Sequence, residues 1–420
     1  MTRLLLTTSA VALATGMVGG TAARAADWDV AVEGGFETFA AYAAPDVNGF
    51  VGEEYDGIDN KIDAEIAFAP SITLDNGLQI GASVSLEGVS DDSEQIDESY
   101  MFIEGTFGRI LLGKTDSAGY LMHYGAPDVT FVNVNSGSMT AFIPFSGTVF
   151  GNLSNDAALI DTDEDDVPDT EGLLVGHDIF YGTLGSTYLE NRAASGAQRL
   201  TYFTPRFAGF QFGLSYARDQ LTDDQTQVNL DDSELHDIFD VGANYVNSFG
   251  ALNVVVSGRW GIGFDDRDAV PGTDIGENPQ VWATGLNLGY AGVTVGASYG
   301  EQNDAGIFDG RSWDAGIAYE TGPWGVSFTY FNGENVNDEA DADGDGAIGP
   351  GDALPATGVD ETLDQYLLGL SYILAEGVAL NAFGAYVAFD EETGDAGGPI
   401  EATGDDVDGW VVGTGIKISF

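Results

Sequence analysis

Segments of about ten residues, in which apolar residues alternate with small or polar ones, recur along most of the chain. In residues 78–87, for example, Leu, Ile, Ala, Val and Leu alternate with Gln, Gly, Ser, Ser and Glu. A repeat of two places successive side chains on opposite faces of a β-strand. Each segment therefore predicts a strand with one face toward an apolar medium and the other toward a polar one. The same pattern recurs in residues 210–216, 252–259, 324–330 and 416–420.

Two classes of connection alternate between these segments. One class is short and rich in Gly, which is typical of hairpin turns; it comprises residues 75–77, 108–109, 208–209, 248–250, 291–292, 322–323 and 375–377. The other class is long and acidic, at residues 45–59, 90–97, 117–196, 220–235, 264–278, 302–310, 333–362 and 390–407. Counting the segments between them gives about 16 strands, an even number with all short turns at one end.

This layout predicts an all-β fold, a transmembrane antiparallel up-and-down β-barrel of about 16 strands. Tyr and Trp recur near the predicted strand ends, as the aromatic girdles of such barrels require. A soluble β-sandwich is the alternative, because its strands also alternate. It is disfavoured because it needs no aromatic bands and rarely reaches this number of strands.

Composition excludes several other classes. The 420 residues include 59 Gly, which disfavours a helical bundle because Gly destabilises helix interiors. The formal net charge is −55, so we expect no nucleic-acid partner, since phosphate contacts need clustered Lys and Arg. There is no Cys, which excludes disulfides, thiolate metal sites and a Cys nucleophile.

The N-terminal 25 residues have the pattern of a secretory signal peptide. Arg3 precedes an apolar run from Leu4 to about Val18, and Ala23-Arg24-Ala25 follows as a small-x-small cleavage motif. We expect cleavage after Ala25, which leaves residues 26–420 as the barrel. A short anchor helix is the alternative, although three Gly residues interrupt the run.

The chain ends in Phe420 on an amphipathic last segment, which resembles the signal for assembly of outer-membrane barrels. Residues 100–116 (YMFIEGTFGRILLGKTD) and 199–216 (RLTYFTPRFAGFQFGLSY) are similar to hairpins that flank the longest loop of α-proteobacterial general porins. The resemblance covers essentially the whole chain after residue 25. It implies a homotrimer of barrels in the Gram-negative outer membrane, in contact with membrane lipid and lipopolysaccharide.

In that family each barrel is a water-filled channel for small hydrophilic solutes, and the third external loop folds into the lumen. The resemblance therefore implies that residues 117–196, about 80 residues in length, form a constriction loop. Whether all of this unusually long loop enters the lumen is left open.

A calcium-type loop lies within residues 333–362. From Asp341 onward, carboxylates fall at positions one, three, five and twelve, with Gly at six and a backbone carbonyl at seven. This is the ligand order of an EF-hand loop, although position twelve is Asp rather than Glu. The predicted ligands are Asp341, Asp343, Asp345, Ala347 and Asp352, and we expect structural Ca²⁺ here.

A second acidic repeat lies within the long third loop. It resembles the Asp-x-Asp-x-Asp repeats of thrombospondin-type calcium loops, although Asp166 replaces the usual Gly. Its predicted ligands are Asp161, Asp163, Asp165 and Asp169. For both repeats, a solvated acidic loop without bound metal is the alternative interpretation.

The chain has only 13 basic residues, so those near the predicted lumen are candidates for a charged constriction. A porin constriction typically sets basic wall groups against acidic loop groups. The candidates are Lys61, Lys114, Arg192 and Arg199, opposite Asp116 and Asp128. The alternative is that these groups form rim or salt-bridge charges without a role in transport.

The sequence thus predicts an outer-membrane porin for passive diffusion. Inward-facing acids with few nearby bases predict a cation preference; they are Asp29, Glu33, Glu37, Asp63, Glu65 and Glu87. A substrate-selective channel of the same fold and a calcium-dependent surface or adhesion barrel remain alternatives. No catalytic spacing stands out around the three His residues, so we do not expect an enzyme.

Overall fold

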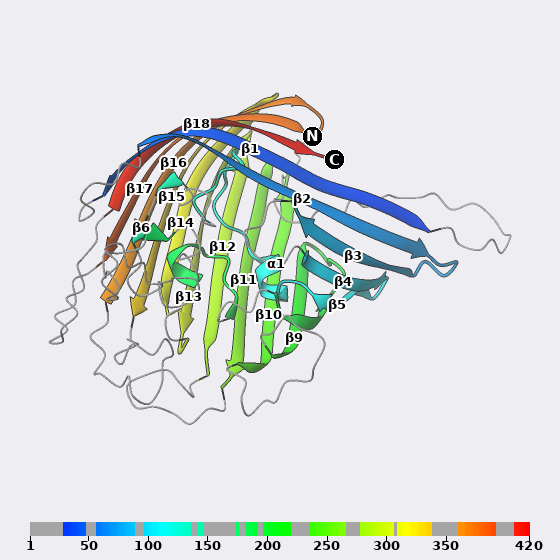
Figure 1. Cartoon of the computed structure of the whole chain (residues 1–420). Coiled ribbons are helices and arrows are strands. Elements are labelled where there is room, and N and C mark those ends of the chain that lie inside the picture. The colour runs from blue at the N-terminus through cyan, green and yellow to red at the C-terminus, as the bar shows by residue number, and fades with distance from the viewer. Residues whose placement is uncertain are drawn as a thin grey trace, which may run out of the picture.

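The computed structural model describes sixteen long strands that hydrogen-bond in one closed ring (Figure 1). It describes residues 28–47, 56–88, 96–135, 142–143, 145–146, 174–175, 182–191, 196–219, 235–265, 278–305, 309–337, 359–391 and 407–420. The ring strands are β1 (Asp29–Val47), β2 (Gly57–Thr73), β3 (Gln79–Glu87), β4 (Ile96–Gly105), β5 (Gly108–Lys114), β8 (Gln198–Phe203), β9 (Phe210–Asp219), β10 (His236–Phe249), β11 (Leu252–Phe264), β12 (Gln280–Tyr290), β13 (Val293–Asn303), β14 (Gly310–Thr321), β15 (Trp324–Asn337), β16 (Val359–Ala375), β17 (Val378–Glu391) and β18 (Val407–Ser419).

The residues between β5 and β8 contain four short elements, all within the predicted third loop. They are α1 (Ala118–Met122), β6 (Phe145–Ser146), β7 (Leu174–Val175) and η4 (Gly182–Leu184). β6 and β7 pair with each other outside the ring. In the part of the chain that the structure describes, no helix has the length and apolar character needed to cross a membrane.

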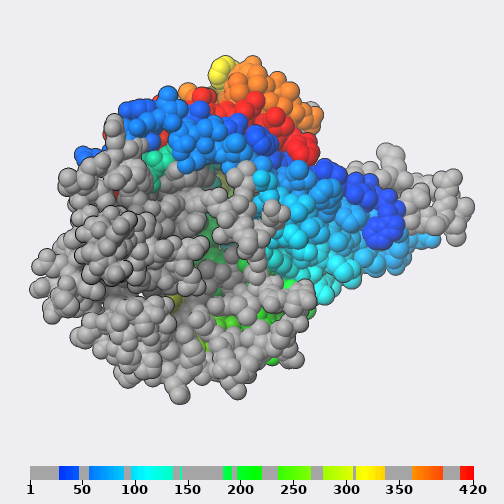
Figure 2. Space-filling model, in the orientation of Figure 1, coloured from blue at the N-terminus to red at the C-terminus, as the bar shows by residue number. Residues whose placement is uncertain are grey.

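The ring closes by antiparallel pairing of its first and last strands. The β1–β18 ladder runs from Gly35 opposite Ser419 to Val47 opposite Val407. Gly34 and Phe420 exchange both backbone hydrogen bonds, at 3.0 and 3.1 Å, so the terminal Phe belongs to the closing ladder. Figure 2 shows the blue and red surfaces of these strands as one continuous wall. The predicted barrel is therefore confirmed, and the β-sandwich alternative is wrong.

Short turns join neighbouring strands where the sequence predicts them. Ala208 and Gly209 both have positive φ, 49° and 94°, as do Ala291 and Gly292, at 52° and 86°. A two-residue turn of this hand matches the twist of the paired strands. Gly at the second position avoids a further steric penalty, which explains the Ala-Gly sequence at both turns.

The outward face is apolar and banded by aromatic rings. Leu214, Leu286 and Phe328 are 43 to 50% exposed at mid-strand. Near the long-loop ends, outward rings pack in pairs such as Trp282–Tyr299, 5.0 Å between centroids, and Tyr386–Trp410, 4.8 Å. Near the short turns, Trp324 packs on Tyr372 at 4.5 Å. These two bands correspond to the interfacial girdles of a membrane barrel.

Several strands extend beyond the apolar alternation that predicted them. β15 continues to Asn337 and β16 begins at Val359, so their ladder reaches into the predicted 333–362 loop. The side chains there are mostly polar, for example Glu334 opposite Thr362. Backbone pairing does not require apolar side chains, so the ladder continues after the apolar alternation of the sequence has ended.

A charge introduced on the outward face tests the membrane assignment. We expect Leu286→Arg, at the middle of β12, to lower the free energy of unfolding by about 2–4 kcal/mol because the guanidinium would face the centre of the bilayer. Leu252→Arg, on the same face beside a short turn, should cost at most about 1 kcal/mol. Denaturant unfolding of both variants in lipid vesicles measures the difference, and equal costs would contradict the assignment.

Candidate functional site

The inner face of the ring is lined by buried polar side chains. They alternate with the exposed apolar residues described above, so the two faces of each strand differ in polarity. Most are uncharged hydrogen-bonding groups, with a few buried charges among them. They include Ser215, Asp240, Asn244, Ser257, Arg259, Ser298, Asp314, Ser327, Gln365 and Asn381.

Residues 117–135 run along this inner face and hydrogen-bond to it. Successive backbone N–H groups donate to side chains of different strands: Ala118 to Ser215 Oγ at 3.1 Å, Tyr124 to Ser257 Oγ at 3.1 Å, Ala126 to Asp314 Oδ2 at 2.9 Å, Val129 to Ser327 Oγ at 3.2 Å, and Phe131 to Asn381 Oδ1 at 3.1 Å. A segment without regular backbone pairing thus has its polar groups satisfied by the strand side chains.

The segment follows the inner wall around about half of the ring. Ser117 is the N-cap of α1, and its hydroxyl accepts a hydrogen bond from Tyr120 N; the helix contacts β9, β10 and β11. Fourteen residues after Ser117, the ring of Phe131 stacks on Phe39 of β1, with 5.4 Å between centroids. β1 and β10 lie almost opposite each other in the ring order.

Two buried ion pairs hold the segment at its start. Arg199 of β8 lies 3.7 Å from Glu190, and Glu190 Oε1 accepts a hydrogen bond of 2.6 Å from Ser117 N. Glu190 therefore joins the outgoing and returning arms of the third loop to the wall. Arg259 of β11 pairs with Asp240 of β10, which also accepts a hydrogen bond from Gly119 N.

Arg259 and Asp240 were not among the residues predicted from the sequence. The alternation in the sequence places Arg259 on the same strand face as Ser257, which is two residues earlier, so its inward orientation could be predicted. Their pairing with each other and with Gly119 could not be read, since it depends on the path of the loop.

The predicted constriction residues fall into two groups. Lys61 and Lys114 lie on the wall and are partly exposed; Lys61 Nζ is 2.6 Å from Asp59, and Lys114 Nζ donates to Ile96 O at 2.9 Å. Arg199 is only 3% exposed and is engaged in the contact with Glu190. Arg192 lies outside the described residues.

The two predicted acidic partners contact the loop and the wall. Asp128 Oδ1 accepts hydrogen bonds from Thr130 N and from Ser327 Oγ, both at 2.8 Å. Asp116 is surrounded by Glu190, Glu98 and Arg199, and burial raises its pKa well above the usual value. Burial also raises the pKa of Asp128. Among the ion pairs of the described residues, none sets either acid against Lys61 or Lys114.

A row of carboxylates lies on the inner face of β1, β2 and β3, and we call Glu37, Asp63, Glu65 and Glu87 the acidic wall. Glu37 is directly opposite Asp63, and Glu65 is directly opposite Glu87. Lys417 pairs with Glu37, and Ser85 Oγ donates to Glu65. Asp63 and Glu87 are exposed. Like charges directly opposite each other destabilise a sheet, so this arrangement is not explained by stability.

Both predicted calcium repeats lie outside the described residues, including Asp341, Asp343, Asp345, Ala347 and Asp352, and Asp161, Asp163, Asp165 and Asp169. Within the residues that the structure does describe, no cluster of three or more His, Asp or Glu side chains is arranged to hold a metal ion.

The closed ring, with its apolar banded exterior and polar inner wall, defines a transmembrane β-barrel of the channel-forming class. A sequence model described as Gram-negative porin matches residues 5–392. The chain therefore belongs to the Gram-negative porin family, and its location is the outer membrane.

Among curated proteins, the chain is similar to an outer membrane porin protein of Bordetella pertussis, with 26% identity over 208 residues. That match covers 44% of this chain, and the chain spans about half the length of this relative. The sequence prediction of the porin family is confirmed by the family match.

Solved structures share the fold at low identity. The outer membrane channel DcaP of Acinetobacter baumannii matches with a TM-score of 0.53 and 13% identity, over 96% of this chain and 100% of that one. An anion-selective porin from Comamonas acidovorans (TM-score 0.52, 16% identity) covers 94% and 100%, respectively. OmpT of Vibrio cholerae in its trimer form (TM-score 0.52, 13% identity) covers 94% and 99%.

His123 follows α1 and is buried between the loop and the wall. Its Nε2 is 3.2 Å from Thr187 Oγ1, and its Nδ1 is 3.5 Å from Ser257 Oγ. Thr187 also accepts a hydrogen bond from Asn135 and contacts Ser298. Burial, and then the positive charge of Arg259, lower the pKa of His123 to about 3. The imidazole is therefore neutral in the folded protein at neutral pH.

The pKa of His123 predicts a loss of stability in acid. The unfolded chain protonates this imidazole below about pH 6.5, whereas the folded protein does not until about pH 3. The free energy of unfolding should therefore fall as the pH decreases between these values, by about 3 kcal/mol at pH 4.5. His123→Gln removes the imidazole and with it this pH-dependent loss. The free energies of unfolding of the variant and the wild type should therefore approach each other as the pH falls from 7 to 4.5. Parallel stability curves from denaturant unfolding would contradict this.

Proposed function

We propose that the protein forms a water-filled channel for passive diffusion of small hydrophilic solutes and ions across the outer membrane. The observation that carries the proposal is the polarity of the ring, whose outward face suits lipid while its inner wall presents hydroxyl, amide and charged groups. Membership of the porin family supports it. Solutes would move down their gradients without a chemical step, and we propose no enzymatic activity.

We propose that residues 117–196 narrow this channel. The hydrogen bonds of residues 117–135 with β9, β11, β14, β15 and β17 support the proposal, because they hold the backbone of the loop against the inner wall. Lys61 and Lys114, which are partly exposed on the wall, remain our candidates for groups that contact passing solutes. Arg199, Asp116 and Asp128 would instead act by positioning the loop.

We further propose that the channel prefers cations. The acidic wall leaves three carboxylates, Asp63, Glu65 and Glu87, without a basic partner among the ion pairs of the described residues. Phe131 and Phe142 of the loop pack on Phe39 of β1, and the Phe142 ring lies 5.8 Å from Lys61 Nζ, so the loop lies beside this stretch of the wall; Asp63 and Glu87 are exposed there. Uncompensated negative charge in a narrow passage raises the local cation concentration.

Reversal potentials in planar bilayers under a salt gradient test the cation preference. We expect the wild-type channel to favour K⁺ over Cl⁻, and Glu65→Gln combined with Glu87→Gln to reduce the permeability ratio by roughly twofold or more, since two fixed charges are removed. The matched control combines Glu301→Gln with Asp364→Asn, which also removes two charges, from the outward faces of β13 and β16, where these carboxylates accept hydrogen bonds from Tyr299 and Tyr330. Anion preference of the wild type, or an equal effect of the control, would contradict the proposal.

The fold itself does not decide the selectivity. The Comamonas acidovorans porin of similar fold is anion-selective by its title. The sign of the preference depends on which charged side chains face the lumen, and these differ between proteins of 16% identity. A substrate-selective channel remains the second candidate, and solute-dependent block of the current would distinguish it from a general pore. A surface or adhesion role of the long loops is the third.

We propose that the loop containing Asp341, Asp343, Asp345, Ala347 and Asp352 binds structural Ca²⁺, and that the repeat Asp161, Asp163, Asp165 and Asp169 provides a second site. The carboxylate spacing supports the first site, since hard oxygen ligands in this order suit Ca²⁺. The net charge of −55 also supports it, because divalent cations reduce the repulsion between acidic loops. In external loops, sites of this type fill at about 10⁻⁴–10⁻³ M.

Calcium binding is tested by comparing loop variants. We expect millimolar Ca²⁺ to raise the thermal stability of the wild type and to alter its single-channel conductance, and a chelator to reverse both. Asp343→Asn combined with Asp345→Asn should weaken the response by about tenfold or more, because two ligand charges are lost. Asp338→Asn combined with Glu339→Gln changes the same charge in the same loop, outside the ligand order, and should leave the response intact. Equal loss in both variants would indicate general screening instead of a site.

We also propose that the barrels assemble as homotrimers in contact with membrane lipid and lipopolysaccharide. The resemblance of the sequence to trimeric porins supports this, as does the trimer form of a solved structure with the same fold. The mass of the intact assembly in mild detergent measures it. Cleavage of the predicted signal peptide near Ala25 remains part of the same proposal.

A further inference from the structure

Glycines of the inner wall lie against the loop segment of residues 117–135. They come from β10, β12, β14, β15 and β16, and a Cβ atom added to any of them would meet the segment. All are inward residues, because a neighbouring residue in each strand is an exposed apolar side chain, for example Leu286, Ile317 or Val326. We call these five residues the glycine seat: Gly242, Gly285, Gly316, Gly325 and Gly369.

The contacts of the glycine seat follow the order of the chain. A Cβ atom added to each glycine would meet Ala118 O from Gly242 at 3.0 Å, Tyr124 O from Gly285, Pro127 O from Gly316 at 3.0 Å, Val129 Cβ from Gly325 at 3.1 Å, and Thr130 Cγ2 from Gly369. The first three partners are backbone oxygens, which cannot turn away as the end of a side chain can. The segment therefore lies closer to the wall than any residue with a side chain would allow.

Short polar side chains hold the segment at this distance. Ser257 of β11 and Asn381 of β17 accept hydrogen bonds of 3.1 Å from its backbone, and Ser327 accepts one of 3.2 Å two residues from Gly325 on β15. A serine or asparagine side chain reaches the backbone of the segment only if that backbone lies next to the wall. The glycines thus supply the space and the polar side chains supply the bonds.

The segment is also held at both ends. Gly119 N donates to Asp240 at its start. Val132 and Val134 near its end are buried in an apolar cluster with inward residues of β15–β18. The wall behind the segment is a closed, hydrogen-bonded ring. A side chain added between this ring and the segment should therefore displace the segment, which has no regular backbone pairing, toward the lumen.

We propose that the glycine seat sets the width of the channel, so that these five glycines determine the largest solute that can pass. This inference rests on the proposed channel function and on the narrowing of the lumen by the third loop. Glycine carries no charge, so the seat controls size and leaves the sign of the ion preference to the charged residues of the wall.

Uptake of neutral sugars into proteoliposomes, in a series of increasing size, tests the inference. We expect Gly316→Ala and Gly369→Ala each to slow uptake of the largest sugar that the wild type admits by roughly twofold or more, and to slow a pentose much less, because overpacking shifts the segment into the lumen. The matched control is Gly258→Ala on β11, since nothing lies within 4 Å of the Cβ atom that it adds. It should behave as the wild type does.

A compensating exchange distinguishes a shift of the segment from general damage to the fold. Thr130→Ser removes the methyl group that the new side chain of Gly369→Ala would meet, and it keeps the hydroxyl that contacts Asp128 and Val132 O. The double variant should recover most of the lost uptake of the large sugar. A misfolded barrel would not be restored by a smaller loop residue.

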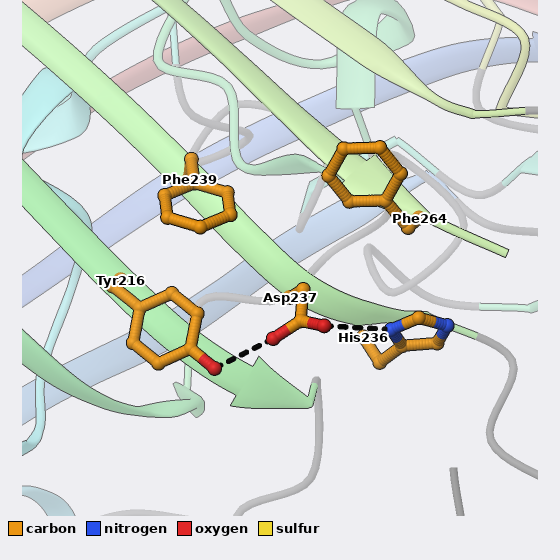
Figure 3. Close-up of a pocket in the computed structure, with 5 residues that line it drawn as sticks. All are labelled: Tyr216, His236, Asp237, Phe239 and Phe264. Carbon is orange, nitrogen blue, oxygen red and sulfur yellow. Dashed lines mark hydrogen bonds and ion pairs between the residues drawn. The ribbon is translucent and has the colours of Figure 1, made fainter.

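The outward face of β10 offers a second control. Phe239 packs on Tyr216 with 5.0 Å between ring centroids, beside Phe264 in a pocket on the outer side of the barrel (Figure 3). Phe239→Leu changes the packing of the strand that carries Gly242, but on the face directed away from the segment. It should leave sugar uptake unchanged.

Three results would overturn the inference in a channel that admits sugars. They are equal uptake by the two seat variants and Gly258→Ala, faster uptake of the large sugar by a seat variant, and no recovery when Thr130→Ser is added to Gly369→Ala. A wild type that admits no sugar of any size would instead contradict the proposed channel function, so the two failures can be distinguished.

Discussion

The absence of water in the bilayer core is the constraint on which the rest of this structure depends. Every backbone N–H and C=O at that depth must find a partner within the protein, so a sheet can cross only if it closes on itself. Here closure is made by the β1–β18 ladder and by the two hydrogen bonds between Gly34 and Phe420. Once the ring is closed, outward positions must be apolar, and the polar residues are left for the inner wall.

Side chains of the inner wall supply the hydrogen-bond partners that backbone groups supply in regular secondary structure. Residues 117–135 have few backbone partners of their own, yet their N–H groups are satisfied by Ser, Asp and Asn side chains from strands around the ring. Burying the ion pair of Arg259 and Asp240 is costly unless further hydrogen bonds are made, and Gly119 N supplies one of them. Removing either Arg259 or Asp240 would leave the other charge buried without a partner. Because Asp240 also bonds Gly119 N, the same pair holds the start of the loop against the wall.

Charge is distributed unevenly around the ring. The strands β8–β17 carry buried charges that are paired or bonded to the loop, such as Arg199 with Glu190. The strands β1–β3 carry the acidic wall, in which Glu65 and Glu87 face each other with no opposite charge between them in the register. A repulsive pair of this kind lowers stability, and attraction of passing cations provides a reason for its presence.

The sequence alone determined the barrel, the number of strands, the inward and outward faces and the short turns, because strand periodicity and turn chemistry are local properties that a closed sheet must obey. It also placed Arg199 and Thr201 on one inward face. Only the tertiary structure decided that Arg199 pairs with Glu190, that Asp128 bonds Ser327 and that Arg259 pairs with Asp240. These contacts join residues separated by up to 199 positions, and they depend on the path of the loop, which no periodicity encodes.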